Sequence, residues 1–372
     1  MRKVTLGEVC SRGSSNIAQK DLNGNNGKYP IYGASGFIKC VDFYHQGKEY
    51  VAVVKDGAGI GRTMLLPANS SVIGTMQYLI PNEDVDVRYL YYAVLNMNLS
   101  KYFSGATIPH IYYRDYQNEE FMLPSMSEQG KKADNLQKIE RLITVKQTEL
   151  TKLNDLVKSR FVEMFGDPEV NDKQWPVYKL DKLCDVGSSK RIYQNEQSSE
   201  GVAFWRISDL VSKMDTGIAE SGLFIPEERY EELKEQGLVP VEGDILVTAR
   251  GTLGRCYIIS AEDQFYFQDG MISWLSGYKH GITPLYLQYL FMMQGIKRQI
   301  DAMQAGSTVA YLSIAMLKKL DIMVPDNDAQ RQFSSFVAQT DKSKHCVRND
   351  LLRCLQRQVI NDSYRRLAYD SE

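Results

Sequence analysis

Two glycine-rich turns flanked by basic residues are the stretches of this sequence whose residue types best suit binding. Gly57–Gly61 lies between Lys55 and Arg62, and a similar turn lies between Arg250 and Arg255. Neither turn has the spacing of a dinucleotide-binding motif or a P-loop. Glycines at a strand edge let the backbone approach a phosphate group or another strand closely. The pattern therefore indicates binding or close strand packing, and it does not indicate catalysis.

Further basic residues lie in polar loops elsewhere. Lys190-Arg191 is the basic pair of a Ser-, Gln- and Asn-rich stretch, and Arg206 follows Trp205. Arginine reads guanine edges in DNA, whereas lysine, serine and threonine mostly contact phosphates. The alternative for each residue is an ordinary solvated surface side chain. The candidate DNA-contacting residues are Lys55, Arg62, Tyr112, Tyr113, Arg114, Lys190, Arg191, Arg206, Arg250, Arg255, Thr308 and Tyr311.

Motifs for catalysis are missing from the sequence. An adenine methyltransferase needs an Asn/Asp-Pro-Pro-Tyr/Phe motif to hold a flipped base, and neither this motif nor the P-loop sequence occurs. Asp167-Pro168-Glu169 followed by Asp172 faintly resembles a nuclease cluster, but this composition is more typical of a turn. The six cysteines form no C-x-x-C pair and there are only four histidines. We therefore predict neither a metal site nor a catalytic residue.

Length and net charge limit the number of domains and the ways in which the chain can bind nucleic acid. Its 372 residues are enough for two domains of ordinary size. The net charge of −2 speaks against a protein that coats nucleic acid by itself. It allows a reader whose basic residues are local, or whose partners supply positive charge. Since no apolar run is long enough for a membrane helix and no signal sequence is evident, we expect a cytoplasmic protein without membrane contact.

The sequence repeats itself once, over about half its length. Thr5–Cys10 resembles Lys179–Cys184 at an offset of 174 residues, and Leu123-Pro124 resembles Val324-Pro325 at an offset of 201. Similar anchors between them follow in the same order at offsets of 193 and 197. Chance matches would scatter, so the rising offset indicates a duplicated unit whose second copy holds 27 additional residues.

Each copy has the same predicted order of elements. Short apolar runs bounded by Gly, Pro and Asn predict strands, and an amphipathic helix follows them. One more apolar segment then ends at a proline, and a long helix comes last. The predicted strands include Tyr50–Val54, Gly74–Ile80, Asp244–Thr248 and Met271–Leu275, and the amphipathic helices are Val87–Phe103 and Pro284–Met303.

The long helices carry apolar residues in heptads. Ser125 and Glu128 form a capping box at the start of the first helix, and Gly166 ends it. Asp326 or Asp328 is expected to cap the second helix, which reaches about Leu367. Steps of three and four residues place the apolar side chains on one stripe, as a coiled coil requires. The residues expected to pair the helices are Leu136, Ile139, Ile143, Leu150, Leu153 and Val157 on the first, and Val337, Val347, Leu351 and Cys354 on the second.

A helix with so narrow an apolar stripe needs a partner, and the other copy's helix is the obvious one. The alternative is that each helix packs only on its own domain. We expect an α+β fold with two strand-rich target-recognition domains in a pseudo-twofold arrangement, separated by two long antiparallel helices. The expected boundaries are 1–124 and 168–325 for the domains, and 125–167 and 326–372 for the spacer helices.

At this point the chain resembles the specificity subunit of Type I restriction–modification systems, over essentially its whole length. The resemblance depends on the duplication together with several short stretches. These stretches are Lys28–Gly36, Val54–Arg62, Leu123-Pro124 with Glu128-Gln129, Ser159–Asp167, Phe204–Leu210 and Ala249–Arg255. One departure is that the first copy shows no clear match to Phe204–Leu210.

The resemblance implies a non-catalytic subunit that reads a split sequence in double-stranded DNA. It implies two adenine-methyltransferase subunits as partners and, where present, two restriction subunits that act as motor and nuclease. It implies no cofactor in this chain, with S-adenosylmethionine bound by the methyltransferase partners.

Two alternatives are a stand-alone duplicated DNA-binding protein or nuclease, and a coiled-coil adaptor. A nuclease would need paired acidic residues at matching points of both copies, and the sequence shows none. A coiled-coil adaptor would not need two diverged domains with basic, glycine-flanked loops.

Overall fold

The structure is a computed structural model that describes residues 1–105, 108–304 and 310–367, with the backbone alone for 357–367. Contacts group the chain into two compact units, Met1–Thr148 with Val347–Glu372, and Glu149–Cys346. Both long helices are thus divided between the units, and the expected boundaries of separate domains and spacers stay a prediction. No helix in the described ranges is long and apolar enough to cross a membrane.

The first unit contains a four-stranded antiparallel sheet in the order β2-β8-β5-β6. β5 is buried along its whole length, which explains its unbroken apolar sequence. A three-stranded sheet, β4-β3-β7, and an antiparallel pair, β1-β9, complete the strands. The elements are β1 (Arg2–Thr5), α1 (Leu6–Val9), β2 (Cys10–Ser14), β3 (Tyr29–Gly33), β4 (Gly36–Val41), β5 (Tyr50–Val54), β6 (Thr63–Leu66), β7 (Ser71–Val72), β8 (Met76–Pro81), α2 (Val87–Asn96), α3 (Tyr113–Tyr116) and β9 (Glu120–Leu123), with 3-10 turns at Gln19–Leu22 and Leu99–Tyr102.

The second unit repeats these three sheets, as β11-β17-β14-β15, β13-β12-β16 and β10-β18. The predicted strands and the predicted duplication are confirmed. The elements are β10 (Val177–Lys179), α5 (Leu180–Leu183), β11 (Asp185–Gly187), β12 (Val202–Trp205), α6 (Ile207–Thr216), β13 (Phe224–Ile225), α7 (Glu227–Glu235), β14 (Ile245–Thr248), β15 (Cys256–Ile258), β16 (Phe265–Phe267), β17 (Ile272–Ser276), α8 (Pro284–Phe291), α9 (Gln294–Ala302), α10 (Ile314–Lys318) and β18 (Asp321–Met323), with a 3-10 turn at Gln194–Glu196.

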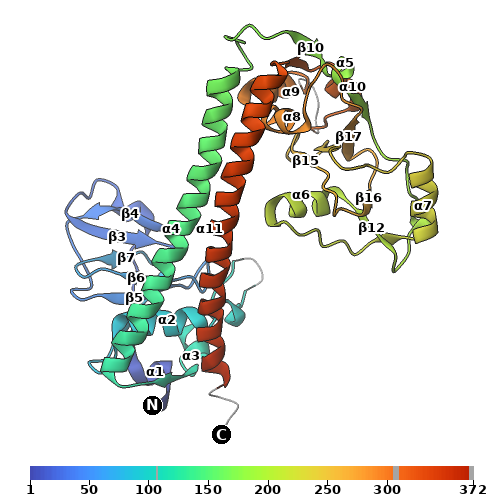
Figure 1. Ribbon diagram of the computed structural model, residues 1–372. Coiled ribbons are helices and arrows are strands. Elements are labelled where there is room, and N and C mark those ends of the chain that lie inside the picture. The colour runs from blue at the N-terminus through green and yellow to red at the C-terminus, as the bar shows by residue number, and fades with distance from the viewer. Residues whose placement is uncertain (106–107, 305–309, 368–372) are drawn as a thin grey trace. The chain divides into compact units, whose positions relative to one another are not determined.

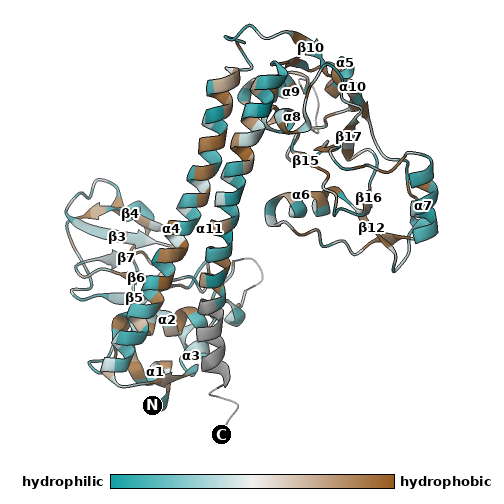
Figure 2. Ribbon diagram, viewed as in Figure 1, coloured by the Kyte–Doolittle hydropathy of each residue, from teal (hydrophilic) through white to brown (hydrophobic). Residues whose placement is uncertain are grey.

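The first copy shows no clear match to Phe204–Leu210 in sequence. In the structure β3 corresponds to β12, which ends at Trp205, while the part that begins α6 has no counterpart among the described residues of the first unit. The Ile73 amide donates to the Tyr32 carbonyl at 2.9 Å, just as the Gln268 amide donates to the Trp205 carbonyl. In the first unit β3 turns directly into β4, whereas α6 and α7 flank β13 in the second unit. These two helices account for much of the additional length, and α7 is mostly hydrophilic (Figure 2).

Two helices predicted as single elements are each divided in two. The segment Val87–Phe103 forms α2 and a 3-10 turn, because Asn98 takes a left-handed conformation with φ of 48°. The segment Pro284–Met303 forms α8 and α9, because Met293 is extended with ψ of 150°. An α-helix needs φ near −63° and ψ near −42°, so either conformation ends it.

The long helices are α4 (Met126–Phe165) and α11 (Asn327–Leu367). The predicted ends are confirmed for α4: the Ser125 amide donates to a carboxylate oxygen of Glu128 at 3.2 Å, and Gly166 has φ of +82°. At α11, Asp326 is the capping residue, since its carboxylate accepts from the Ala329 amide at 2.7 Å. With 40 residues, α4 is ~60 Å long.

In each unit a segment of α4 lies beside a segment of α11 that runs in the opposite direction (Figure 1). In the second unit the Phe161 and Phe333 rings are 5.4 Å apart, and in the first Lys146 Nζ is 3.3 Å from an Asp350 carboxylate oxygen. The expected antiparallel pair and the α+β fold are confirmed. The predicted pairing residues are all buried or half-buried: Leu136, Ile139, Ile143, Leu150, Leu153, Val157, Val337, Val347, Leu351 and Cys354.

At the start of α4 the helix packs on its own domain, which was the alternative to pairing with α11. Leu136, expected to pair with the other helix, forms a small cluster with Ala133 and with Tyr92 of α2. The Tyr92 hydroxyl also donates to Glu140 at 2.8 Å. The helix that follows the first set of strands is therefore fixed to its own domain before it continues along α11.

A buried glutamine in the first turn of each long helix ties that helix to its domain. In the first unit Gln129 Oε1 accepts from the Asp86 amide, and Gln129 Nε2 donates to the carbonyls of Asp84 and Pro124, at 2.8 to 3.0 Å. In the second unit Gln330 bonds Thr283, Gly281 and Pro325 in the same way. Both side chains are 1% exposed.

Replacing either glutamine with leucine should destabilise its unit while keeping the side-chain volume similar. Gln129→Leu or Gln330→Leu leaves several buried backbone groups without partners, and we expect a loss of about 2–4 kcal/mol in the free energy of unfolding. Urea denaturation of the purified chain measures it. The exposed Gln332→Leu is the control, and equal stability of all three variants would show that the buried hydrogen bonds contribute nothing.

A charge on the buried stripe should disrupt the helix pair. Leu150→Asp and Leu351→Asp each place an unpaired carboxylate on the half-buried stripe, at a cost on the order of 3 kcal/mol. We expect loss of helix pairing with the strands of each unit still folded, measured by hydrogen exchange of the long helices. Exposed Lys152→Asp is the control; unchanged exchange in both seam variants would contradict the pairing.

Candidate nucleic-acid interface

The two glycine-rich turns have the same backbone construction. In the first, the Val54 amide donates to the Arg62 carbonyl and the Gly61 amide to the Val54 carbonyl, both at 2.9 Å. In the second, Thr248 makes the same two bonds with Arg255 and Gly254. A Cβ atom at Gly61, where φ is +79°, would lie 2.6 Å from the Ser100 amide nitrogen, so this turn requires glycine.

A second segment crosses each turn and brings a partner side chain to it. The Ile111 amide donates to the Lys55 carbonyl, and the Leu312 amide donates to the Ala249 carbonyl, both at 2.9 Å. The residue that follows the accepting carbonyl, two positions beyond β5 or β14, therefore meets the residue that precedes the crossing amide. In the first unit Asp56 pairs with His110 through a carboxylate oxygen and Nδ1. In the second unit the Arg250 guanidinium lies over the Tyr311 ring, 4.9 Å from its centroid.

The loop after β11 reaches the same end of the second unit's sheet. The Ser188 hydroxyl donates to the Ile272 carbonyl at 2.8 Å, and the Lys190 amide donates to the Tyr266 hydroxyl at 2.8 Å. The Ala249 amide donates to the Met271 carbonyl at 2.9 Å. The start of this loop is thus tied to β17 near Met271, which also bonds the backbone before Arg250, while Lys190 is tied to β16 of the three-stranded sheet.

Several predicted arginines are already paired with carboxylates. Arg255 is 2.5 Å from Asp215, and this hydrogen bond lowers the pKa of Asp215. Arg191 is 2.8 Å from Asp269, and that hydrogen bond raises the pKa of Arg191. Such pairs fix a side chain and use part of its capacity to donate hydrogen bonds.

The other basic candidates differ in how firmly they are held. Arg206 is 3.9 Å from Asp209, which the turn of α6 places beside it. Arg62 donates to the Ala34 carbonyl at 2.8 Å, and Lys55 is 4.0 Å from Asp56. Asp209 is buried, but the Arg206 side chain and the other two contacts are at least partly exposed to solvent, where such interactions contribute little to stability and leave the cation able to change partners.

Comparison with known sequences identifies the family. A model of the family described as the Type I restriction modification DNA specificity domain matches residues 1–155 and 172–351. The chain belongs to this family. The two matched stretches contain the two copies of the repeat, so the family match and the structural duplication agree.

Individual relatives extend this result. A putative type I restriction enzyme specificity subunit of Haemophilus influenzae is 26% identical over 357 residues, covering 92% of this chain and 88% of that protein. The MjaVIII specificity subunit of Methanocaldococcus jannaschii is 23% identical over 282 residues, covering 70% of this chain and 64% of that protein.

Solved structures agree in fold. The specificity subunit of the M. genitalium Type I system has a TM-score of 0.62 at 16% identity, with 97% of this chain and 94% of that chain covered. A chain from a structure on complex assembly and conformational transition of the type I R-M system has a TM-score of 0.53 at 14% identity, with 95% and 94% covered. At these identities the comparison supports the fold alone.

The tyrosines at the start of α3, Tyr112 and Tyr113, differ in their exposure to solvent. Tyr112 is 43% exposed, and Arg114 lies 4.7 Å from its ring centroid. Tyr113 is half-buried: it packs against the domain core, and its ring lies edge-on to that of Tyr116. Burial raises its pKa to about 12. The contact of Tyr113 with DNA stays a prediction. Thr308 lies outside the described residues.

Sequence reasoning missed the acid–base pair of the first unit. Asp56 and His110 occupy the places of Arg250 and Tyr311, but neither the charge nor the residue type matches across the copies. The offsets of nearby anchors could have aligned these positions. The search for basic residues instead selected neighbouring Lys55, whose backbone carbonyl, rather than its side chain, organises the site.

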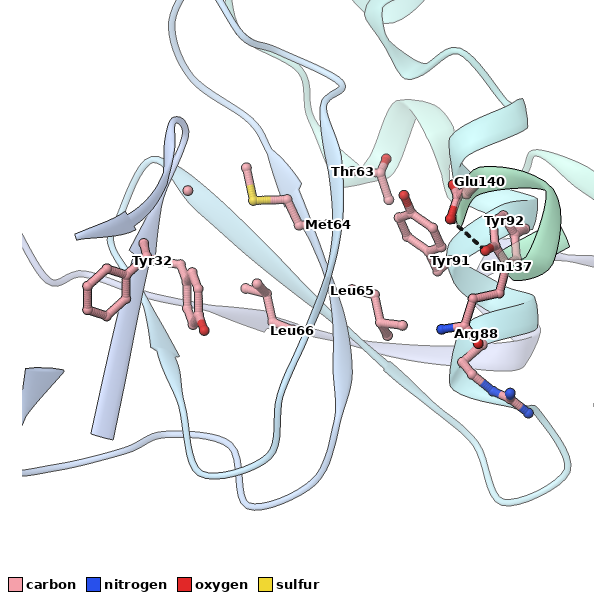
Figure 3. A pocket seen from close by; sticks show the side chains of 12 residues that line it. Tyr32, Thr63, Met64, Leu65, Leu66, Arg88, Tyr91, Tyr92, Gln137 and Glu140 are labelled. Carbon is pink, nitrogen blue, oxygen red and sulfur yellow. Dashed lines mark hydrogen bonds between the residues drawn. The ribbon is translucent and has the colours of Figure 1, made fainter. Parts of the chain in front are cut away.

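A cavity of about 400 Å³ in the first unit was also not predicted (Figure 3). Aliphatic and aromatic side chains such as Met64, Leu66 and Tyr91 line much of it. Arg88 lies at one side but is held by Asp86 at 3.1 Å and by Asp134 at 2.5 Å. With its cation neutralised in this way, the cavity is poorly suited to bind phosphate.

Proposed function

We propose that this chain is the DNA specificity subunit of a Type I restriction–modification complex. In this proposal each recognition domain reads one half of a split target in double-stranded DNA. The paired long helices hold two adenine-methyltransferase subunits and, where present, restriction subunits that act as motor and nuclease. The chain itself is non-catalytic, and S-adenosylmethionine is bound by the methyltransferase partners.

The observation that carries this proposal is the duplication. The two domains have matching sheets and the same hydrogen bonds in their glycine-rich turns. They differ in the side chains beside these turns, which are Asp56 with His110 in one domain and Arg250 with Tyr311 in the other. This is what two readers of different short sequences need, and the family match to both copies supports it. A coiled-coil adaptor would not need two domains that differ in the side chains at matching positions.

Apolar residues outside the helix seam support a role in holding partner subunits. Leu142 and Leu156 on α4 are each 50% exposed, and they lie two heptads apart. On α11, Leu352 is 55% exposed. Exposed leucines on the outer surface of a long helix are suited to pack against the apolar face of a helix from a partner subunit.

The direct test is methylome sequencing. The chain is expressed with its cognate methyltransferase subunits in a host without adenine methylation, and each is also expressed alone. We expect a split adenine-methylated motif only when both are present. A continuous motif would contradict the two-reader proposal, and methylation or cleavage by the chain alone would favour an enzyme.

Specific DNA binding should depend on the methyltransferase subunits. With a net charge of −2 and several arginines paired with carboxylates, the isolated chain should bind DNA weakly and with strong salt dependence. Fluorescence anisotropy with target and scrambled duplexes, at several salt concentrations, measures this with and without the partner. Equal affinity and specificity for the isolated chain would refute it.

The two halves should be separable. Replacing residues 171–320 with the matching segment of another family member should change one half-site and leave the other half-site and the gap unchanged. As the complementary control, changing the length of α4 should change the gap and leave both half-sites unchanged. We expect half-sites about one helical turn apart, ~34 Å, or a nearby multiple. Methylome sequencing reads both results, and a swap that altered both half-sites would disprove modular reading.

A further inference from the structure

Arg250 differs from the other candidate arginines of the second unit because it has no carboxylate partner among the described residues. Arg191, Arg206 and Arg255 each lie within 4.0 Å of a carboxylate. In the described ranges Arg250 has no such partner, and its Nε is buried without a hydrogen bond. The side chain as a whole is half-buried, so its terminal N–H groups are the donors that an incoming acceptor could reach.

The structure also fixes the position of this guanidinium. The Ala249 amide bonds the Met271 carbonyl, and the Ala249 carbonyl accepts from Leu312, so the backbone before Arg250 is held on both sides. Tyr311 holds the guanidinium plane by stacking, at 4.9 Å. The next residue, Gly251, has φ of +69°, and no heavy atom of the described residues lies within 4 Å of a Cβ built there, so the turn itself is not covered at this point.

The first unit places opposite chemistry at the matching position. Asp56 follows the central strand there, and His110 takes the place of Tyr311. The surrounding backbone hydrogen bonds are the same in the two units. A residue needed only for folding would keep its chemistry, whereas a residue that reads a base must change when the base changes.

We propose that Arg250 reads a guanine of the second half-site, and that Tyr311 is a positioning residue for it. Two parallel N–H groups of the guanidinium would donate to guanine N7 and O6 in the major groove. Lys190, which is exposed on the loop after β11, suits the phosphate backbone of the same half-site. Asp56 would repel the same two acceptors, so the first domain would exclude guanine at its equivalent step. This inference rests on the proposed function.

The experiment uses the complex of the full chain with its cognate methyltransferase subunits. Competition binding compares duplexes that carry each of the four base pairs at every position of the second half-site, for wild type, Arg250→Gln and Arg250→Lys. We expect Arg250→Gln to lose a guanine preference of roughly 5- to 140-fold at one position, with the first half-site unchanged. Arg250→Lys should recover affinity but only part of the preference, since it keeps the charge without the planar fork.

Outcomes separate this inference from the proposed function. If the wild-type complex has no split target, the proposed function fails. If it has one, but the second half-site contains no guanine or Arg250→Gln discriminates bases as wild type does, the inference about Arg250 fails. A uniform loss of affinity across all sequences, fully restored by Arg250→Lys, would assign Arg250 to a phosphate and would also overturn the inference.

Tyr311 provides a matched pair of variants. Tyr311→Phe keeps the ring and should retain the guanine preference, whereas Tyr311→Ala should weaken it at the same position as Arg250→Gln. Asp56→Asn in the first unit is the control and should leave the second half-site unaltered. A preference that survives in Tyr311→Ala would show that stacking does not position the guanidinium.

Discussion

The buried glutamine at the start of each long helix is the constraint on which the rest of the architecture depends. Gln129 and Gln330 satisfy backbone groups of the domain and of the strand end that precedes the helix. An unpaired amide at 1% exposure would be costly, so these bonds allow one direction for the helix as it leaves the domain. The pairing of α4 with α11 can then use a stripe that would be too narrow to hold an isolated helix.

The sequence was sufficient to predict features that depend on periodicity or on end signals. The heptads predicted the antiparallel helices, and Ser125, Glu128 and Gly166 predicted the ends of α4. The breaks at Asn98 and Met293 were missed, because the apolar pattern continues through both while the backbone conformation changes. The orientation of Tyr113 could not be predicted, since a tyrosine beside Arg114 has the same residue type whether it faces the core or solvent.

The site shows how one scaffold can serve two different purposes. Sheet order, turn hydrogen bonds and the crossing segment are repeated in both units, and these features position the side chains. The residues that they position, Asp56 with His110 and Arg250 with Tyr311, are free to differ because their neighbours are held by backbone bonds. The side chains at these points can therefore change with little effect on folding.

The division of the helices between the two units has a consequence for the order in which the protein folds during synthesis. The first unit contains Met1–Thr148 together with the chain beyond Val347, so its last segment leaves the ribosome after the whole second unit has been made. Until then the apolar stripe on the first half of α4 lacks its partner helix, and it is open to wrong contacts or to a chaperone. The second unit, Glu149–Cys346, is continuous and can close earlier. A chain that stalls before Val347 would thus leave the domain made first as the one that is incomplete.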